Sequence, residues 1–272
     1  MPNVSFAGSE SPPKIELPDA DVGMCFIPCV SIGRFWAYPY AAPTIERMTN
    51  PMNQAALAAV PLFPLPNVVL FPQAVLPLHI FEERYKLMVA DAVKGARQIA
   101  MALLQPGWEK NYHCHPGIDP VVCVGTILSH ERLADGRYNL LLQGTTRAKV
   151  IRESTEYPYR LAELRPLIDE PVMEIDLADE RRQLALAFED ERLFRTGIGR
   201  RFHELLNGPV PTATIADLIA FNFLEDINLK QSLLAECNVR SRVSRTVRSF
   251  IRLHSLLRQS APASFCREPS LN

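Results

Sequence analysis

Short apolar runs of high β propensity begin at Ala58, and prolines interrupt them at close intervals. These prolines are Pro61, Pro64, Pro66, Pro72 and Pro77. Proline cannot donate a hydrogen bond to a neighbouring strand, so within sheets it is found at strand starts, bulges and edges. The pattern therefore predicts short strands that enter a sheet or lie at its edge.

A helix is predicted directly after these runs, over residues 82–95. Glu82 and Glu83 stand where a helix N-terminus favours negative charge, and Gly95 stands where helices commonly end. Four apolar side chains between them recur at the spacing of one helix face: Tyr85, Met88, Val89 and Ala92. This is the one helix predicted for the first half of the chain.

Five later runs have the length and composition of strands: residues 98–105, 121–133, 137–143, 146–153 and 159–167. Asp135-Gly136 separates two of them, and an Asp-Gly pair between apolar runs is a strong hairpin signal. Strands this apolar need a core and some way of closing their edges. With one helix inserted early, they predict a small barrel or a strongly curled sheet.

After Pro171 the apolar residues recur at the spacing of a helix face. Residues 172–208 and 212–261 contain no proline, which would cost a helix interior about 3 kcal/mol. Capping residues predict helix starts at Thr214, Asn228 and Asn238, and the last helix is expected to end near Gln259.

The predicted fold class is α+β, a β-rich domain followed by a helical bundle. Its expected segments are a poorly ordered extension over 1–57, the β-rich domain over 58–168, the bundle over 169–260 and a tail over 261–272.

Composition narrows the function classes. The 272 residues are 47% hydrophobic, which excludes a disordered chain, and their formal charge of −1 gives no overall attraction to nucleic acid or anionic lipid.

Residues 1–20 lack a secretory signal pattern, and Arg34 and prolines interrupt the apolar stretch 22–45, so we expect no membrane span. The six scattered cysteines indicate reduced thiols in a cytoplasmic protein. Met48 and Met52 offer alternative starts.

No common catalytic signature is found. The chain has no Gly-Lys pair for a phosphate loop, no G-x-S-x-G, no H-E-x-x-H and no C-x-x-C. His113, Cys114 and His115 with Cys25 and Cys29 could supply zinc ligands, but adjacent residues rarely converge on one ion. We therefore expect no catalytic residue, no cofactor and no metal.

The last predicted helix carries six arginines and no acid, a local charge of +6. They are Arg240, Arg242, Arg245, Arg248, Arg252 and Arg258. One interpretation is a phosphate-binding ridge, with Arg240, Arg245, Arg248 and Arg252 as nucleic-acid contacts. The other is that this helix lies beside the acidic segment 169–191, whose net charge is −7. We favour the second and expect no nucleic acid.

Four blocks follow one another at intervals that suit one domain: Pro61–Val93, Gly107–Glu109, Val124–Val150 and Tyr159–Leu167. They resemble the N-terminal substrate-binding domain of the ATP-dependent Lon protease, and the resemblance covers about 58–259. It implies a PUA-like β pseudo-barrel followed by a helical bundle. The chain carries no ATPase or peptidase module, so it is similar to stand-alone Lon-domain proteins and is expected not to be an enzyme.

The resemblance implies a binding role, toward unfolded or tagged protein substrates or a partner complex such as a protease or other ATPase. Large aromatics in the polar loop 106–120, Trp108 and Tyr112, are candidate peptide contacts. His79, Phe81, Arg84 and Tyr85 could line a groove that faces the helical half. The alternative is that all six are packing residues, with His79 as a hydrogen-bonded structural histidine. An RNA-binding protein and an enzyme of unrecognised type remain as other hypotheses.

Overall fold

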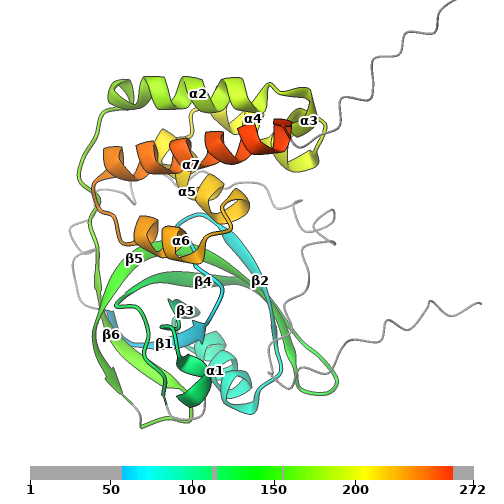
Figure 1. Ribbon diagram of the computed structural model, residues 1–272. Helices are drawn as coiled ribbons and strands as arrows, with labels where there is room; N and C mark the ends of the chain where they lie inside the picture. The colour runs from blue at the N-terminus through cyan, green and yellow to red at the C-terminus, as the bar shows by residue number, and fades with distance from the viewer. Residues whose placement is uncertain (1–56, 112–114, 155, 260–272) are drawn as a thin grey trace, which may run out of the picture.

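The computed structural model describes residues 57–111, 115–154 and 156–259. A barrel of strands carries α1 at one end, and the helices α2 to α7 are stacked on the other (Figure 1). The strands are β1 Leu57–Leu65, β2 Val75–Ile80, β3 Gln98–Leu103, β4 Val121–Arg132, β5 Tyr138–Ser154 and β6 Arg160–Pro166. The helices are α1 Glu83–Lys94, α2 Ala178–Phe188, α3 Glu191–Phe194, α4 Gly197–Asn207, α5 Thr212–Phe223, α6 Ile227–Leu234 and α7 Val239–Gln259, with the short 3-10 helices η4 Trp108–Asn111 and η5 Glu174–Leu177.

The α+β prediction is confirmed. The sheet order is β2-β5-β4-β3-β1-β6, and β5 also pairs with β6, so five strands close into a ring and β2 lies outside it on β5. Only β1 and β3 run parallel. Closing the ring pairs the backbone N–H and C=O groups that an open sheet of such apolar strands would leave exposed at its edges. The extension was predicted over residues 1–57, but Leu57 already begins β1; residues 1–56 and the predicted tail over 261–272 lie outside the described residues.

The prolines of β1 are not at a sheet edge, because β1 lies between β3 and β6. Its pairing with β6 covers Leu57–Leu62, and its pairing with β3 begins at Leu62. Pro61 and Pro64 therefore each occupy a position that is paired on one side, where a missing N–H costs little. Pro77 lies in β2, which pairs with β5 alone in the sheet.

The two strands predicted over 137–143 and 146–153 are one continuous strand, β5, and the prediction of a break was wrong. The first half of β5 pairs with β2 and the second half with β6, so the strand changes partner near Gly144. The backbone of Gly144 exchanges hydrogen bonds with Gln73 and Ala74. A polar and glycine-containing stretch resembles a turn in sequence, but here it marks a bend in a paired strand.

The predicted hairpin is present between β4 and β5. Gly136 has φ +85°, a conformation that glycine adopts without strain, and Asp135 Oδ1 accepts from Arg137 N at 3.1 Å.

Two helix starts were predicted too late in the chain. α5 begins at Thr212, whose N–H and hydroxyl donate to the carboxylate of Glu174, 38 residues earlier in the chain. α6 begins after Asp226, which accepts from the N–H groups of Asn228 and Leu229. Asn238 caps α7 as predicted, accepting from Ser241 N at 2.8 Å.

The barrel and the bundle share buried apolar surface. One buried cluster joins strand residues such as Leu142 to Leu224 and Leu234 of the helical half. A second cluster fills the bundle, where the rings of Phe202 and Phe250 both stack on Phe188. The shared cluster fixes the helices against the barrel, and the division at 168/169 stays a prediction.

Candidate functional site

A hollow of about 220 Å³ lies where the start of α1 meets the ends of β1 and β3 and the beginning of β6. We call it the Tyr85 pocket. Its lining residues are Pro64, Arg84, Tyr85, Leu104, His115, Pro116, Pro158, Tyr159 and Arg160. Two of the six predicted peptide contacts, Arg84 and Tyr85, are therefore brought together here.

Tyr85 is held from two sides. Its ring lies 4.6 Å from the ring of Phe63 in β1, and Arg84 Cζ lies 4.6 Å above its ring centroid. Arg84 Nε also donates to Glu82 at 3.0 Å, so its charge is compensated at the surface. Tyr85 is only 5% exposed, so the first turn of α1 contributes a largely buried ring and a charge-compensated arginine to the pocket.

The opposite wall is equally constrained. The hydroxyl of Tyr159 donates to Asp91 at 3.0 Å, and burial together with this bond raises the pKa of Tyr159 to about 12. Arg160 donates to the carbonyl of Pro116 at 2.8 Å and forms an ion pair with Glu153.

The Tyr85 pocket suits an apolar side chain. Six of its nine lining residues are tyrosines, prolines or a leucine; the other three are His115 and two arginines, and both arginines already have acidic or carbonyl partners. Its volume is below the roughly 300–1,000 Å³ of small-molecule sites, so it matches one inserted side chain rather than a whole ligand. Its lining includes no serine, cysteine or carboxylate that could act as a nucleophile.

His79 and Phe81 do not line this pocket. His79 Nδ1 lies 2.7 Å from Asn139 Oδ1 and its Nε2 lies 3.2 Å from Arg137, while its ring stacks on Phe81 at 6.4 Å. Both nitrogens are engaged, which favours the structural interpretation of His79.

The loop aromatics are only partly described. Trp108 is half-buried in η4, and Tyr112 lies outside the described residues. His113, Cys114, Cys25 and Cys29, four of the five candidate zinc ligands, also lie outside the described residues.

The expected orientation of the groove needs correction. We expected Arg84 and Tyr85 to face the helical half, but α1 lies at the barrel end away from α2 to α7 (Figure 1). The cause is the path of β2, which carries the chain along the barrel before α1 begins.

The arginines of α7 divide into two groups. Arg240, Arg242 and Arg258 form ion pairs with Asp176, Asp169 and Asp190 of the acidic segment. Arg245 donates to Ser232 and forms an ion pair with Glu236, so it belongs to the same compensated group. Arg248 and Arg252 are exposed, and no ion pair to them is found within the described ranges. The acidic segment therefore uses much of the charge that a phosphate ridge would need.

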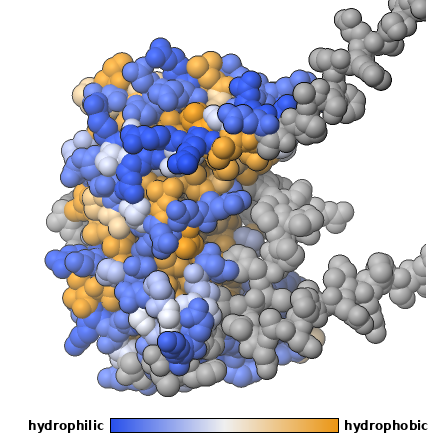
Figure 2. Space-filling view, viewed as in Figure 1, coloured by the Kyte–Doolittle hydropathy of each residue, from blue (hydrophilic) through white to orange (hydrophobic). Residues whose placement is uncertain are grey.

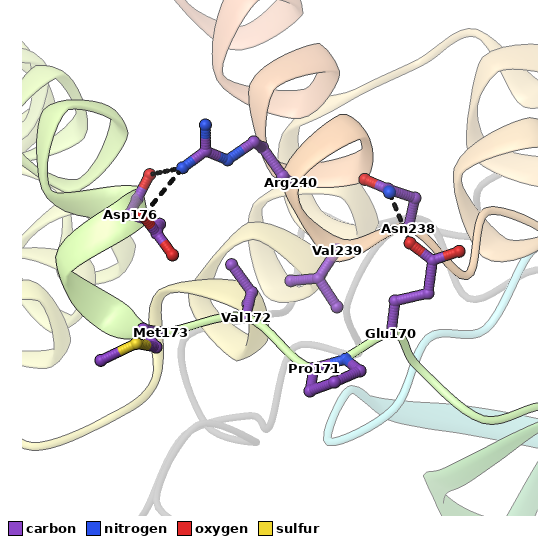
Figure 3. A pocket seen from close by; sticks show the side chains of 8 residues that line it. All are labelled: Glu170, Pro171, Val172, Met173, Asp176, Asn238, Val239 and Arg240. Carbon is purple, nitrogen blue, oxygen red and sulfur yellow. Dashed lines mark hydrogen bonds and ion pairs between the residues drawn. The ribbon is translucent and has the colours of Figure 1, made fainter.

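A second hollow, of about 400 Å³, lies between α7 and the segment that connects the barrel to α2. We call it the linker hollow. It is lined by Glu170, Pro171, Val172, Met173, Asp176, Asn238, Val239 and Arg240 (Figure 3). Sequence reasoning missed it, although bulky apolar residues alternating with acids after Leu167 were a visible signal.

Hydrophobic residues also gather on the face shown in Figure 2, over α6 and the adjoining barrel, beneath a hydrophilic band over α7. Exposed apolar surface of this kind is typical of proteins that bind other polypeptides. No described helix has the length and apolarity needed to cross a membrane. Within the described ranges, no three His, Cys, Asp or Glu side chains are grouped to hold a metal ion.

Comparison with known proteins places these features in a family. Residues 59–250 match the family model of the ATP-dependent protease La (LON) substrate-binding domain. Among curated proteins, Lon protease 2 of Herpetosiphon aurantiacus is 31% identical over 203 residues, covering 74% of this chain and 24% of that protein. Lon protease of Anaeromyxobacter dehalogenans is 28% identical over 212 residues, with 75% and 24% covered. The chain thus spans about a quarter of the length of these relatives.

Solved structures agree on the fold. A Lon N-terminal domain protein from Xanthomonas campestris has a TM-score of 0.52 at 24% identity, covering 71% of this chain and 98% of that one. The N-terminal domain of a Mycobacterium avium complex Lon protease has a TM-score of 0.55 at 15% identity, covering 72% and 98%. Together with the family match over 59–250, the closed barrel and its helical bundle show that the chain belongs to the LON substrate-binding domain family.

Proposed function

We propose that this protein binds polypeptide segments that expose apolar side chains, as unfolded or tagged proteins do, and that the Tyr85 pocket receives one such side chain. The observation that carries the proposal is a pocket of single-residue size in a family described as substrate-binding, lined mainly by rings, prolines and a leucine beside His115 and two paired arginines. Extended chains bind such surfaces through side-chain pockets and backbone hydrogen bonds, without a reactive group. The role is binding rather than catalysis, and the cytoplasm is its proposed compartment.

The binding test uses a fluorescently labelled, permanently unfolded model protein and anisotropy. Pro158 is exposed at the mouth of the pocket, so Pro158→Trp should fill it without disturbing the core. We expect binding to weaken about fivefold or more, which is about 1 kcal/mol. Tyr157→Trp places the same ring one residue away, at a half-exposed position outside the lining, and should bind as the unchanged protein does.

Two outcomes would reject the proposal at different levels. If the unchanged protein binds no unfolded chain, the function itself is wrong. If Pro158→Trp and Tyr157→Trp bind equally well, the function stands and the Tyr85 pocket is not the contact. Trp108→Ala, in η4, tests the proposed loop contact by the same assay.

Docking to a partner complex is the second form of this proposal. The family resemblance supports a protease or other ATPase as the partner. Affinity purification from the source cell with mass spectrometry should recover such an ATPase, and its absence would favour direct client binding.

A further inference from the structure

The linker hollow is a built surface rather than an accidental gap. Two polar contacts tie its walls together, one at each end (Figure 3). Asn238 Nδ2 donates to Glu170 at 2.5 Å, and Arg240 forms an ion pair with Asp176 at 3.1 Å. The same Asn238 caps α7. The hollow therefore keeps its shape because its walls are held by the helix start and by side-chain contacts on both sides.

Bulky apolar side chains are concentrated beside it. Ile168, Met173 and Ile175 are 62%, 69% and 74% exposed, the three highest values among the large hydrophobic residues of the described chain. All three lie within eight residues of one another in sequence, and Met173 lines the hollow. Its floor includes the buried Val239 and the half-buried Val172. A single exposed apolar residue needs no explanation, but a cluster at a concave surface marks an interaction site.

The charge around the hollow identifies its partner. Residues 168–180 contain six acids and no lysine or arginine. Asp169 is compensated by Arg147 and Arg242, and Asp176 by Arg240. Glu170 contacts the neutral Asn238, so the charged lining residues, Glu170, Asp176 and Arg240, leave a net charge of −1. Complementary charge favours a cationic ligand and disfavours an anionic one.

We propose that the linker hollow binds a partner polypeptide segment in which lysine or arginine stands beside a bulky apolar residue. The apolar side chain enters between Val172 and Val239, and the cation lies against Glu170. Met173, an unbranched and adaptable side chain, covers the inserted group. This site lies beside α7, whereas the Tyr85 pocket lies by α1 at the other end of the barrel, so the inference does not depend on the proposed function.

The test measures anisotropy of two labelled peptides with the full chain. One peptide alternates leucine and lysine, and the other has glutamate in place of each lysine. The protein should bind the lysine peptide at least about tenfold more tightly, a difference of 1.4 kcal/mol. Met173→Ser with Ile175→Ser should reduce this affinity by about tenfold, because both side chains are exposed in the free protein and their replacement leaves the core intact.

Matched control variants distinguish binding at this site from nonspecific hydrophobic binding. Leu186→Ser removes a side chain that is 61% exposed on α2 and should leave the affinity unchanged. Glu170→Gln removes the charge and keeps an oxygen that can accept from Asn238. It should lower the affinity for the lysine peptide and leave the affinity for the glutamate peptide unchanged. The Pro158→Trp variant should keep the same preference for the lysine peptide over the glutamate peptide, even if it no longer binds unfolded protein.

Three results would overturn the proposal. They are equal affinity for both peptides, equal loss in Leu186→Ser and in the Met173/Ile175 double variant, or self-association of the protein that the double variant abolishes. The last would assign this surface to a second copy of the chain instead.

Discussion

Arg147 Nη2 donates to Asp217 Oδ1 at 2.6 Å, and this buried contact joins β5 of the barrel to α5 of the bundle. Arg242 of α7 lies against the same carboxylate, with Nε 3.2 Å from Oδ1 in an ion pair that lacks hydrogen-bond geometry. Arg242 also forms a two-pronged contact with Asp169 at 2.6 and 3.0 Å. Two guanidinium groups and two carboxylates thus fix the bundle on the barrel.

The pKa of Arg147 follows from this arrangement. Burial by itself would lower it, but the nearby Asp217 and Asp169 carboxylates outweigh burial and raise it. Arg147 therefore stays charged, and removing one of its two carboxylate partners leaves a buried cation with too little compensation.

Asp217→Ala should destabilise the fold by about 3–5 kcal/mol, because Arg147 and Arg242 would share the half-exposed Asp169 alone. The measurement is urea unfolding followed by circular dichroism. Asp179→Ala removes an exposed partner of Arg182 and should cost about 0–1 kcal/mol. Equal costs for the two variants would show that the buried network does not stabilise the joint.

Gly144→Ala should lower stability by about 3 kcal/mol or prevent folding, because an added Cβ would overlap the carbonyl oxygen of Phe71. The backbone at this bend is held in place, because Gly144 is hydrogen-bonded to the backbone of Gln73 and Ala74. Thermal unfolding would measure the effect. Gly197→Ala, where no atom lies within 4 Å of the new Cβ, is the matched control and should be neutral. A normal melting temperature for Gly144→Ala would contradict the close approach.

Cys123 should resist alkylation in the native protein. It is fully buried in β4, and burial is the main reason that its pKa is raised to about 12. The reactive thiolate is therefore scarce at pH 8, and the thiol is also inaccessible. Iodoacetamide labelling with peptide mapping should modify Cys123 only after denaturant is added, and the half-buried Cys237 earlier. Modification of Cys123 at the same rate with and without denaturant would refute its burial.

Alkaline pH should remove the stability that Tyr159 contributes. Its folded pKa of about 12 is above the value of about 10 for an unfolded tyrosine, so the contribution is complete below pH 10 and is lost as pH rises from 10 to 12. The difference in unfolding free energy between the unchanged protein and Tyr159→Phe should therefore shrink over this window. Because other alkaline effects are common to both proteins, a constant difference would disprove the assignment.

RNA binding should be weak and only slightly salt-dependent. Of the arginines of α7, only Arg248 and Arg252 are exposed and outside any described ion pair, and two phosphate contacts give a slope of log affinity against log salt of about −1.4. Filter binding across salt concentrations measures this slope. Arg248→Glu with Arg252→Glu should abolish RNA binding and leave binding of unfolded protein unchanged. Tight RNA binding with a steep slope would restore the alternative function.

Structural features that depend on residues close together in the chain could be predicted from the sequence. The apolar face of α1, the Asp135-Gly136 hairpin and the Asn238 cap all depend on contacts within a few residues, and each was predicted. The start of α5 was not, because its cap is the carboxylate of Glu174, far away in sequence. Local patterns cannot contain a partner that folding supplies.

The sequence by itself determined the α+β class, the strand and helix content, and the absence of the common catalytic signatures, because periodicity and residue type are local properties. Tertiary structure decided which charges were compensated and which apolar groups met. It paired Arg240 with Asp176 but left Arg248 exposed, and it gathered Tyr85 and Tyr159 into one pocket. Those outcomes depend on distances between segments that adjoin only after the barrel closes and the bundle packs upon it.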